Sequence, residues 1–177
     1  MKWPAVAAVL ALAACSHPPA SVAPGPVAGA PGDSAVAPAT AAAVIEAEVV
    51  ATARQALGKP YLYGGTGQGD AGFDCSGLIQ YAYAQQGISL PRVSTAQATR
   101  GTAVDRSLDA LAPGDILTFA GQPGGNKVNH VGLYLGDGRF IHSSSSRGVM
   151  ESALSASDPY GQWWYQRWVG ARRVIGQ

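Results

Sequence analysis

The spacing of apolar residues divides the chain into a helical part followed by a β part. Ile45, Val49 and Ala53 recur at helical intervals, which predicts a helix that starts at Val44 and ends before Gly58. A glycine-rich run over residues 63–70 follows this helix. The first half of the domain is therefore expected to be helix, loop and a further helix.

The second predicted helix begins directly at a cysteine. Asp74 is a candidate N-cap, Cys75 is the first helical residue, and an apolar run over residues 78–84 continues the pattern. Gly87 is expected to stop this helix after residues 85–86. Residues 88–112 are predicted to be loop with a short helix that begins near Ser94 or Thr95.

The remainder of the chain carries the signals of an antiparallel sheet. Gly136-Asp137-Gly138 between two apolar runs predicts a tight hairpin. The strands are expected at Ile116–Ala120, His130–Leu135, Arg139–Ser143 and Val169–Val174. Helices followed by strands predict an α+β fold, with the N-terminal helices packed on a central antiparallel sheet.

Composition and charge narrow the range of partners. The 177 residues carry a formal net charge of +1, and only 13% of them are charged. Without a basic stripe, nucleic acid is not an expected partner. Nothing in the sequence suggests a coiled coil or a repeat array, so we expect a monomer, and no motif indicates a cofactor.

The N-terminal segment has the pattern of an export signal. Residues 1–14 combine a charged start with a short apolar run, and Leu12-Ala13-Ala14-Cys15 resembles a bacterial lipobox. That resemblance implies lipidation of Cys15 and a membrane anchor. The residue after this cysteine is Ser16 rather than Asp, which then suggests sorting to the outer membrane, with the domain facing the periplasm. The alternative is an ordinary signal peptide in which Cys15 is incidental.

A proline- and alanine-rich segment separates this signal from the domain. We expect residues 15–43 to form a lipidated, disordered tether, and residues 44–177 to form the folded domain. Such a tether could space the domain away from a membrane, or could be a tail without that role.

Cys75 is the candidate nucleophile. The chain has two cysteines, and if Cys15 is lipidated it cannot pair with Cys75 in a disulfide. A thiol on the first turn of a helix faces partial positive charge, which is expected to lower its pKa.

Two histidines supply the partners that a thiol needs. The predicted hairpin places His130 and His142 on neighbouring strands, where both can face the same side of the sheet. One can act as the base and the other can orient it. A zinc site built from Cys75, His130 and His142 is an open alternative, and so is a purely structural role for the histidines.

Over residues of about 50 to 175 the sequence resembles the NlpC/P60 family of papain-like cysteine peptidases. The matching stretches are residues 58–65, 73–78, 90–97, 113–119, 129–135, 140–144 and 169–174. The resemblance implies a bacterial cell-wall hydrolase that acts on peptidoglycan stem peptides, at the γ-D-glutamyl–meso-diaminopimelate bond.

The resemblance also implies roles for individual residues. Cys75 corresponds to the nucleophile, His130 to the base and His142 to the third member of the triad. Tyr63 corresponds to a site-lining tyrosine that helps the oxyanion. The residues implied at the border of the substrate groove are Asp74, Ser76, Arg92 and Ser94.

Each of these assignments has a structural alternative. Asp74 could serve only as a helix cap, Tyr63 as a packing aromatic, and Arg92 and Ser94 as parts of a loop. Two other functions also remain open: an amidase or acyltransferase on the same scaffold, and a non-catalytic envelope protein that binds wall peptides. The aromatic residues near the C-terminus are expected to be core and edge packing residues rather than a sugar-binding surface: Trp163, Trp164, Tyr165 and Trp168.

Overall fold

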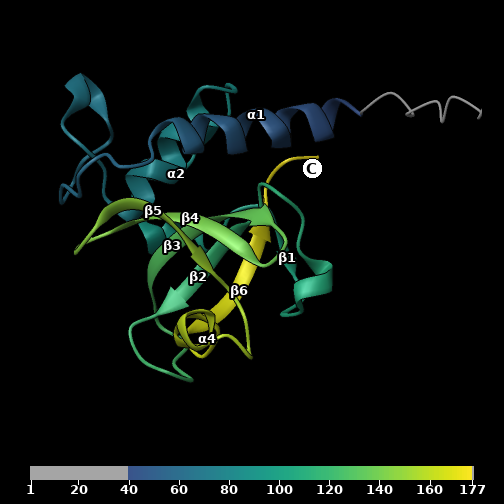
Figure 1. Cartoon of the computed structure of the whole chain (residues 1–177). Coiled ribbons are helices and arrows are strands. Elements are labelled where there is room, and N and C mark those ends of the chain that lie inside the picture. Colours follow the sequence, from purple (N-terminus) through teal and green to yellow (C-terminus); the bar gives the residue numbers. More distant parts are fainter. Residues whose placement is uncertain (1–39, 177) are drawn as a thin grey trace, which may run out of the picture. The chain divides into compact units, whose positions relative to one another are not determined.

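Six antiparallel strands form the single sheet of the domain, in the order β1-β6-β2-β3-β4-β5 (Figure 1). The computed structural model describes residues 40–176. The strands are β1 (Thr102–Val104), β2 (Ile116–Ala120), β3 (Val128–Gly136), β4 (Arg139–Ser144), β5 (Gly148–Ala153) and β6 (Trp168–Arg173).

Four α-helices and two short 3₁₀ turns accompany the sheet. The helices are α1 (Ala41–Gln55), α2 (Cys75–Ala84), α3 (Ser94–Gln97) and α4 (Pro159–Tyr165), and the turns are η1 (Gln68–Asp70) and η2 (Leu108–Ala110). The long helices come first and the strands follow, so the predicted α+β layout is present.

The sheet separates two apolar clusters. On one face, α1 and α2 pack against residues such as Val131, Leu133 and Ile141, which are fully buried. On the other face, Phe119 and Phe140 form a second cluster, against which Trp164 of α4 packs. Figure 1 shows α1 and α2 on one side of the sheet and α4 on the other.

The start of α2 is fixed by a cap and by a close backbone contact. The Asp74 side chain accepts a hydrogen bond from the Gly77 N–H at 2.7 Å, as expected for an N-cap. A Cβ on Gly77 would lie 2.0 Å from the Gly65 carbonyl oxygen. Only glycine lets the glycine-rich loop lie directly on this first turn, so loop and helix together determine where Cys75 is placed.

Three elements were not predicted: β1, β5 and α4. Strand β5 pairs with β4 along its whole length, from Arg139 opposite Ala153 to Ser144 opposite Gly148. Helix α1 begins at Ala41, so three residues that we assigned to the tether are helical. The predicted signal peptide, Cys15 and residues 15–39 of the predicted tether lie outside the described residues.

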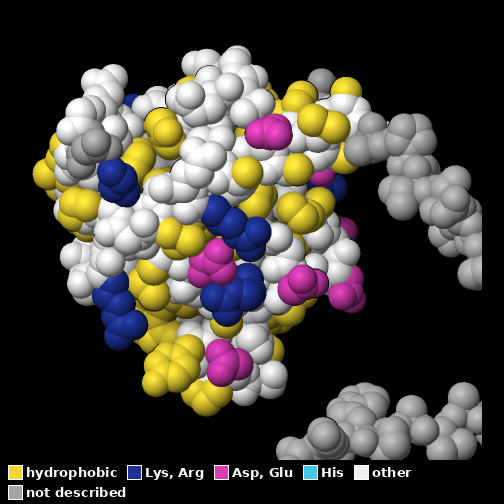
Figure 2. All heavy atoms as spheres, turned by 45° about the horizontal axis from the view of Figure 1, so that its top comes forward, with side chains coloured by type: hydrophobic (Ala, Val, Ile, Leu, Met, Phe, Trp, Pro, Cys, Tyr) yellow, Lys and Arg dark blue, Asp and Glu magenta, His cyan; other side chains and the backbone are white. Residues whose placement is uncertain are grey.

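Two surface properties bear on possible partners. Within residues 40–176, no helix is long and apolar enough to span a bilayer. Figure 2 shows acidic and basic side chains interspersed on the face in view, without a patch of one sign. Among the ion pairs of the described residues, Glu151 pairs with both Arg54 and Arg139, at 3.1 and 3.2 Å from its carboxylate oxygens.

Candidate active site

Cys75 lies at the start of α2, against strand β3. Its thiol is free and half-buried, and its side chain packs against the cluster beneath α2. The backbone N–H of Val131, the residue after His130, is directed at the thiol and favours its thiolate form, as do the N–H groups of Cys75 and Ser76. The nucleophile predicted from the sequence therefore lies beside the strand that carries the predicted base.

The two histidines contact each other. Nε2 of His130 lies 3.0 Å from Nδ1 of His142, and the rings meet edge to face with centroids 5.0 Å apart. Leu133 pairs with Ile141 across β3 and β4, so His130 and His142 both project from the face opposite to that pair. The expectation that the hairpin brings the histidines within hydrogen-bonding distance is confirmed.

A serine follows the histidines in the same chain of contacts. Nε2 of His142 lies 3.0 Å from Oγ of Ser152 on β5. No local pattern indicated a role for Ser152, because its position depends on the pairing of β5 with β4. His142 is 1% exposed, so both of its ring nitrogens find their partners inside the protein.

Trp164 covers the histidine pair. Its ring stacks on His130 with centroids 5.3 Å apart and an interplanar angle of 28°, and it meets His142 edge to face at 4.7 Å. Phe119 and Phe140 contact the same indole at 4.9 and 5.3 Å. Trp164 is therefore a packing residue, as predicted, and what it packs against is the histidine pair.

Burial keeps all three side chains neutral at rest. It lowers the pKa of His130 to about 4, and burial together with the nearby His130 charge lowers the pKa of His142 to about 3. Burial also raises the pKa of the Cys75 thiol, and the Asp74 carboxylate adds to this effect. The prediction of a lowered thiol pKa was wrong in direction, because desolvation outweighs the N–H groups of the first turn.

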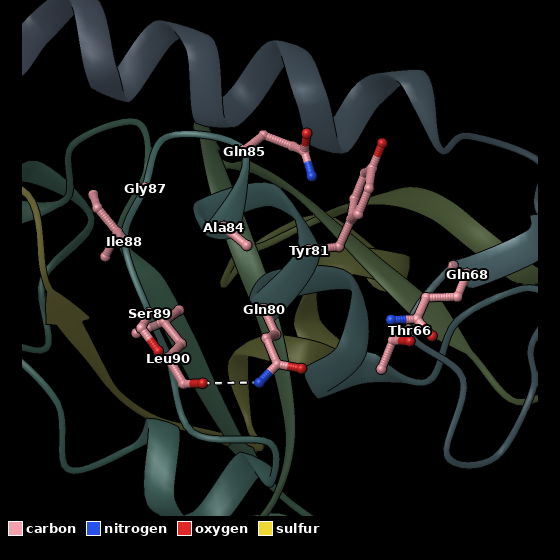
Figure 3. Close-up of a pocket in the computed structure, with 11 residues that line it drawn as sticks. Thr66, Gln68, Gln80, Tyr81, Ala84, Gln85, Gly87, Ile88, Ser89 and Leu90 are labelled. Atoms are coloured by element: carbon pink, nitrogen blue, oxygen red, sulfur yellow. Dashed lines mark hydrogen bonds between the residues drawn. The ribbon is translucent and has the colours of Figure 1, made fainter.

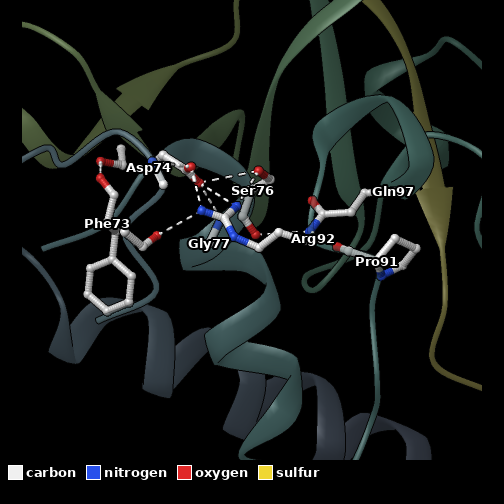
Figure 4. Close-up of polar contacts among 10 residues, drawn as sticks. Phe73, Asp74, Ser76, Gly77, Pro91, Arg92 and Gln97 are labelled. Atoms are coloured by element: carbon white, nitrogen blue, oxygen red, sulfur yellow. Dashed lines mark hydrogen bonds and ion pairs between the residues drawn. The ribbon is translucent and has the colours of Figure 1, made fainter. Parts of the chain in front are cut away.

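Asp74, Ser76 and Arg92 form one network beside the thiol (Figure 4). The Arg92 guanidinium donates to both Asp74 carboxylate oxygens, at 2.9 and 2.6 Å, and to Ser76 Oγ at 3.0 Å. Burial would raise the pKa of Asp74, but Arg92 and the N–H groups of Gly77 and Gly64 outweigh it and hold the pKa below its ordinary value. Three of the four predicted groove residues are thus in mutual contact.

The fourth predicted groove residue, Ser94, lies apart from this network. It is half-buried at the first position of α3 and makes no hydrogen bond to Asp74 or Arg92. A residue that we did not predict ties the segment to α2: Gln97 is fully buried, and its Nε2 donates to the carbonyl oxygens of Ser76 and Pro91, both at 2.9 Å. Its place in a short polar segment gave no indication of burial.

Tyr63, the predicted site-lining tyrosine, is exposed, whereas Tyr61, two residues earlier, is half-buried. The Tyr63 side chain is 88% exposed and makes no hydrogen bond to the histidines or Cys75. Tyr61 is half-buried, and burial followed by the charges of Cys75 and Asp74 raises the pKa of its phenol. Tyr61 bridges to Phe73, two residues before the thiol, which brings it close to the site.

Two hollows flank these elements. The β5–α4 hollow, of about 730 Å³, is lined in part by His142, Ser152, Trp163 and Trp164. Another, of about 500 Å³, lies along α2 and is crossed by a hydrogen bond of 2.8 Å from Gln80 to the Leu90 carbonyl (Figure 3). None of Cys75, His130 and His142 lines that second hollow.

A zinc site was the alternative role for Cys75, His130 and His142. Among residues 40–176, no three His, Cys, Asp or Glu side chains are arranged to hold a metal ion. A free cysteine beside strand β3, together with two contacting histidines on β3 and β4, is the set of side chains that nucleophilic catalysis by a thiol uses.

Comparison with known proteins identifies the family. Residues 58–173 match the NlpC/P60 family, and the chain belongs to it. It is 36% identical over 128 residues to the gamma-D-glutamyl-L-lysine dipeptidyl-peptidase of Bacillus cereus, across 72% of this chain and 36% of the relative. It is 40% identical over 127 residues to the gamma-DL-glutamyl hydrolase of Bacillus subtilis, across 71% of this chain and 29% of the relative.

The chain thus spans about a third of the length of these curated relatives. Among solved structures, the NlpC/p60 domain of the peptidoglycan hydrolase SagA superimposes with a TM-score of 0.57 at 32% identity, covering 73% of this chain and 98% of that one. The α+β fold expected from the sequence resemblance is therefore confirmed.

Proposed function

We propose that this domain is a cysteine endopeptidase that cleaves peptidoglycan stem peptides, with Cys75 as nucleophile, His130 as base and His142 as the residue that orients it. The observation that carries the proposal is the 3.0 Å contact between Nε2 of His130 and Nδ1 of His142. The Cys75 thiol, at the start of α2, faces the backbone N–H of Val131, the residue after His130. The contact between the two histidines leaves Nδ1 of His130 as the one ring nitrogen available to the thiol.

The proposed reaction starts with Cys75, His130 and His142 all uncharged. The Cys75 thiol transfers its proton to Nδ1 of His130 as the sulfur attacks the amide carbonyl. N–H groups at the start of α2 stabilise the oxyanion that forms. The imidazolium of His130 then protonates the leaving amine and a thioester remains. Water hydrolyses this thioester with His130 as base, which releases the acid and restores the thiol.

The substrate is proposed from the family and from the network beside the thiol. Both curated relatives are named for γ-glutamyl bonds, and we propose the γ-D-glutamyl–meso-diaminopimelate bond as the one cleaved. The charged and polar groups of Asp74, Ser76 and Arg92 border Cys75 and are proposed to hold the stem peptide, with Ser94 and Tyr63 further out.

Mass spectrometry of the products formed from defined muropeptides tests this proposal. Wild-type protein should release fragments that end at D-glutamate, and Cys75→Ala should release none while keeping its circular dichroism spectrum. Cleavage at the muramoyl–alanine bond would instead identify an amidase, and transfer of the peptide to an added amine would identify an acyltransferase. Binding without turnover would identify the non-catalytic alternative. Retained cleavage by Cys75→Ala would refute the proposal.

For localisation, we propose that Cys15 is lipidated, and that a tether holds a monomeric domain at the outer membrane, facing the periplasm. The support is the lipobox pattern at residues 12–15. Labelling of cells with a radioactive fatty acid should mark the wild-type chain and not Cys15→Ala, and the variant should leave the membrane fraction. Equal labelling of both chains would contradict the proposal.

A further inference from the structure

Ser152 ends a chain of two hydrogen bonds that starts at the proposed base. Its Oγ lies 3.0 Å from Nε2 of His142, and Nδ1 of His142 lies 3.0 Å from Nε2 of His130. Ser152 projects from β5 on the same face of the sheet as His142, because Met150 pairs with His142 and Ser152 follows two residues later. No role was expected for this serine.

The direction of the two hydrogen bonds decides whether His130 can act as a base. Each neutral imidazole carries a single ring proton. If Ser152 accepts a proton from Nε2 of His142, then Nδ1 of His142 accepts one from Nε2 of His130. Nδ1 of His130 is then unprotonated and can take the thiol proton.

The opposite direction gives an inactive arrangement. If the serine hydroxyl donated to Nε2 of His142, then Nδ1–H of His142 would donate to Nε2 of His130. The single proton of His130 would then be on Nδ1, the nitrogen that must receive the thiol proton. Both arrangements satisfy every hydrogen bond, so the group at position 152 influences which of them is populated.

We propose that Ser152 is a positioning residue for the reaction, whose hydroxyl accepts the Nε2 proton of His142 and so holds both imidazoles in the tautomers that leave Nδ1 of His130 free. This inference rests on the proposed function, since it assumes that His130 takes a proton from Cys75. His142 is 1% exposed and Trp164 meets its ring edge to face, so Ser152 is the protein group that Nε2 of His142 contacts.

Kinetics of substitutions at this position provide the first test. Ser152→Ala should lower kcat by about 10- to 100-fold, less than the ~10⁴-fold loss that follows when an orienting group enforces the wrong tautomer. KM should change less than about twofold, because Ser152 contacts His142 and is proposed to act on the proton transfer rather than on substrate binding. Ser152→Thr keeps a hydroxyl and should recover most of the rate. Ser146→Ala removes an exposed hydroxyl from the same hollow and serves as the matched control.

A second test does not depend on turnover. Long-range nitrogen–proton NMR spectra of the 177-residue chain with ¹⁵N-labelled histidine distinguish the two tautomers, with assignment by substitution of single histidines. His130 and His142 should both carry their proton on Nε2 in wild-type protein and in Cys75→Ala. An Nδ1–H tautomer at His142, or an unchanged kcat in folded Ser152→Ala, would overturn the inference. Retained cleavage by Cys75→Ala would refute the proposed function and leave the tautomer result standing.

Discussion

Replacement of Trp164 by alanine should change two quantities: the stability of the domain and the pKa of His130. The indole contacts five rings, those of His130, His142, Phe119, Phe140 and Trp163, at 4.6 to 5.3 Å between centroids. Truncation of a large buried aromatic costs about 3–5 kcal/mol, and Trp164 is half-buried, so about 2–3 kcal/mol is expected. For a domain of this size, that lowers Tm by roughly 5–10 °C.

The same substitution should change the acidic side of the pH–rate profile. Burial lowers the pKa of His130 from 6.5 to about 4. Trp164 covers one face of that ring, so its removal should raise the pKa of His130 back toward its ordinary value. Because only neutral His130 can accept the thiol proton, the fall in kcat/KM with decreasing pH should begin at a higher pH than in wild-type protein.

The assay is cleavage of a soluble stem peptide between about pH 3.5 and pH 8, with circular dichroism at each pH to confirm folding. Trp164→Phe keeps a ring over His130 and should retain the wild-type profile. Trp163→Ala is the matched control, since this neighbour is 49% exposed and contacts Trp164 rather than the histidines. If Trp164→Ala melts earlier but keeps its acidic limb near pH 4, the burial argument for His130 is refuted.

Three further outcomes follow from the contacts described above. Burial is the main cause of the raised pKa of the Cys75 thiol and the Asp74 charge adds to it, so Asp74→Asn should lower that pKa; an unchanged pH dependence of iodoacetamide alkylation would contradict this. Arg173→Met leaves the buried Asp115 carboxylate without its bidentate partner at 2.8 and 2.7 Å, and should cost about 2–4 kcal/mol, measured by urea unfolding. His142 stays neutral down to a pKa of about 3 when folded but takes up a proton below about pH 6.5 when unfolded. Stability should therefore fall as pH decreases between these values, and His142→Gln should give a flatter curve of urea midpoint against pH.

The helices and strands that carry a local signal, either regular apolar spacing or a cap or turn residue, could be predicted from the sequence. The apolar spacing of α1, the cap and glycine stop of α2, and the glycine turn between β3 and β4 are all local signals, and the structure contains each element. Contact between His130 and His142 followed from that turn, because a short hairpin brings residues of neighbouring strands together.

The missed parts depend on pairing or burial rather than on local sequence. Strand β1 is three residues long and pairs with β6 about 70 positions later, so no short segment contains the information. Strand β5 gains its order from β4, and the contact of Ser152 with His142 depends on that register. Helix α4 did carry a signal, since Asp158 caps it and Pro159 occupies its first turn, but seven residues give little periodicity.

The sign of the thiol pKa was missed for a related reason. A helix start is visible in sequence, whereas the depth at which Cys75 packs is a property of the assembled domain. Burial competes with the helix N–H groups, and its size could not be judged from residue spacing.

The protonated resting state of Cys75 has a consequence for the chemical durability of the protein. Peroxides and disulfides are attacked by thiolates, so a cysteine held as the neutral thiol reacts slowly with both. The sulfur should become strongly nucleophilic only when an amide carbonyl is in place and His130 takes the proton. Burial therefore protects the free thiol of Cys75 from oxidation without a disulfide partner.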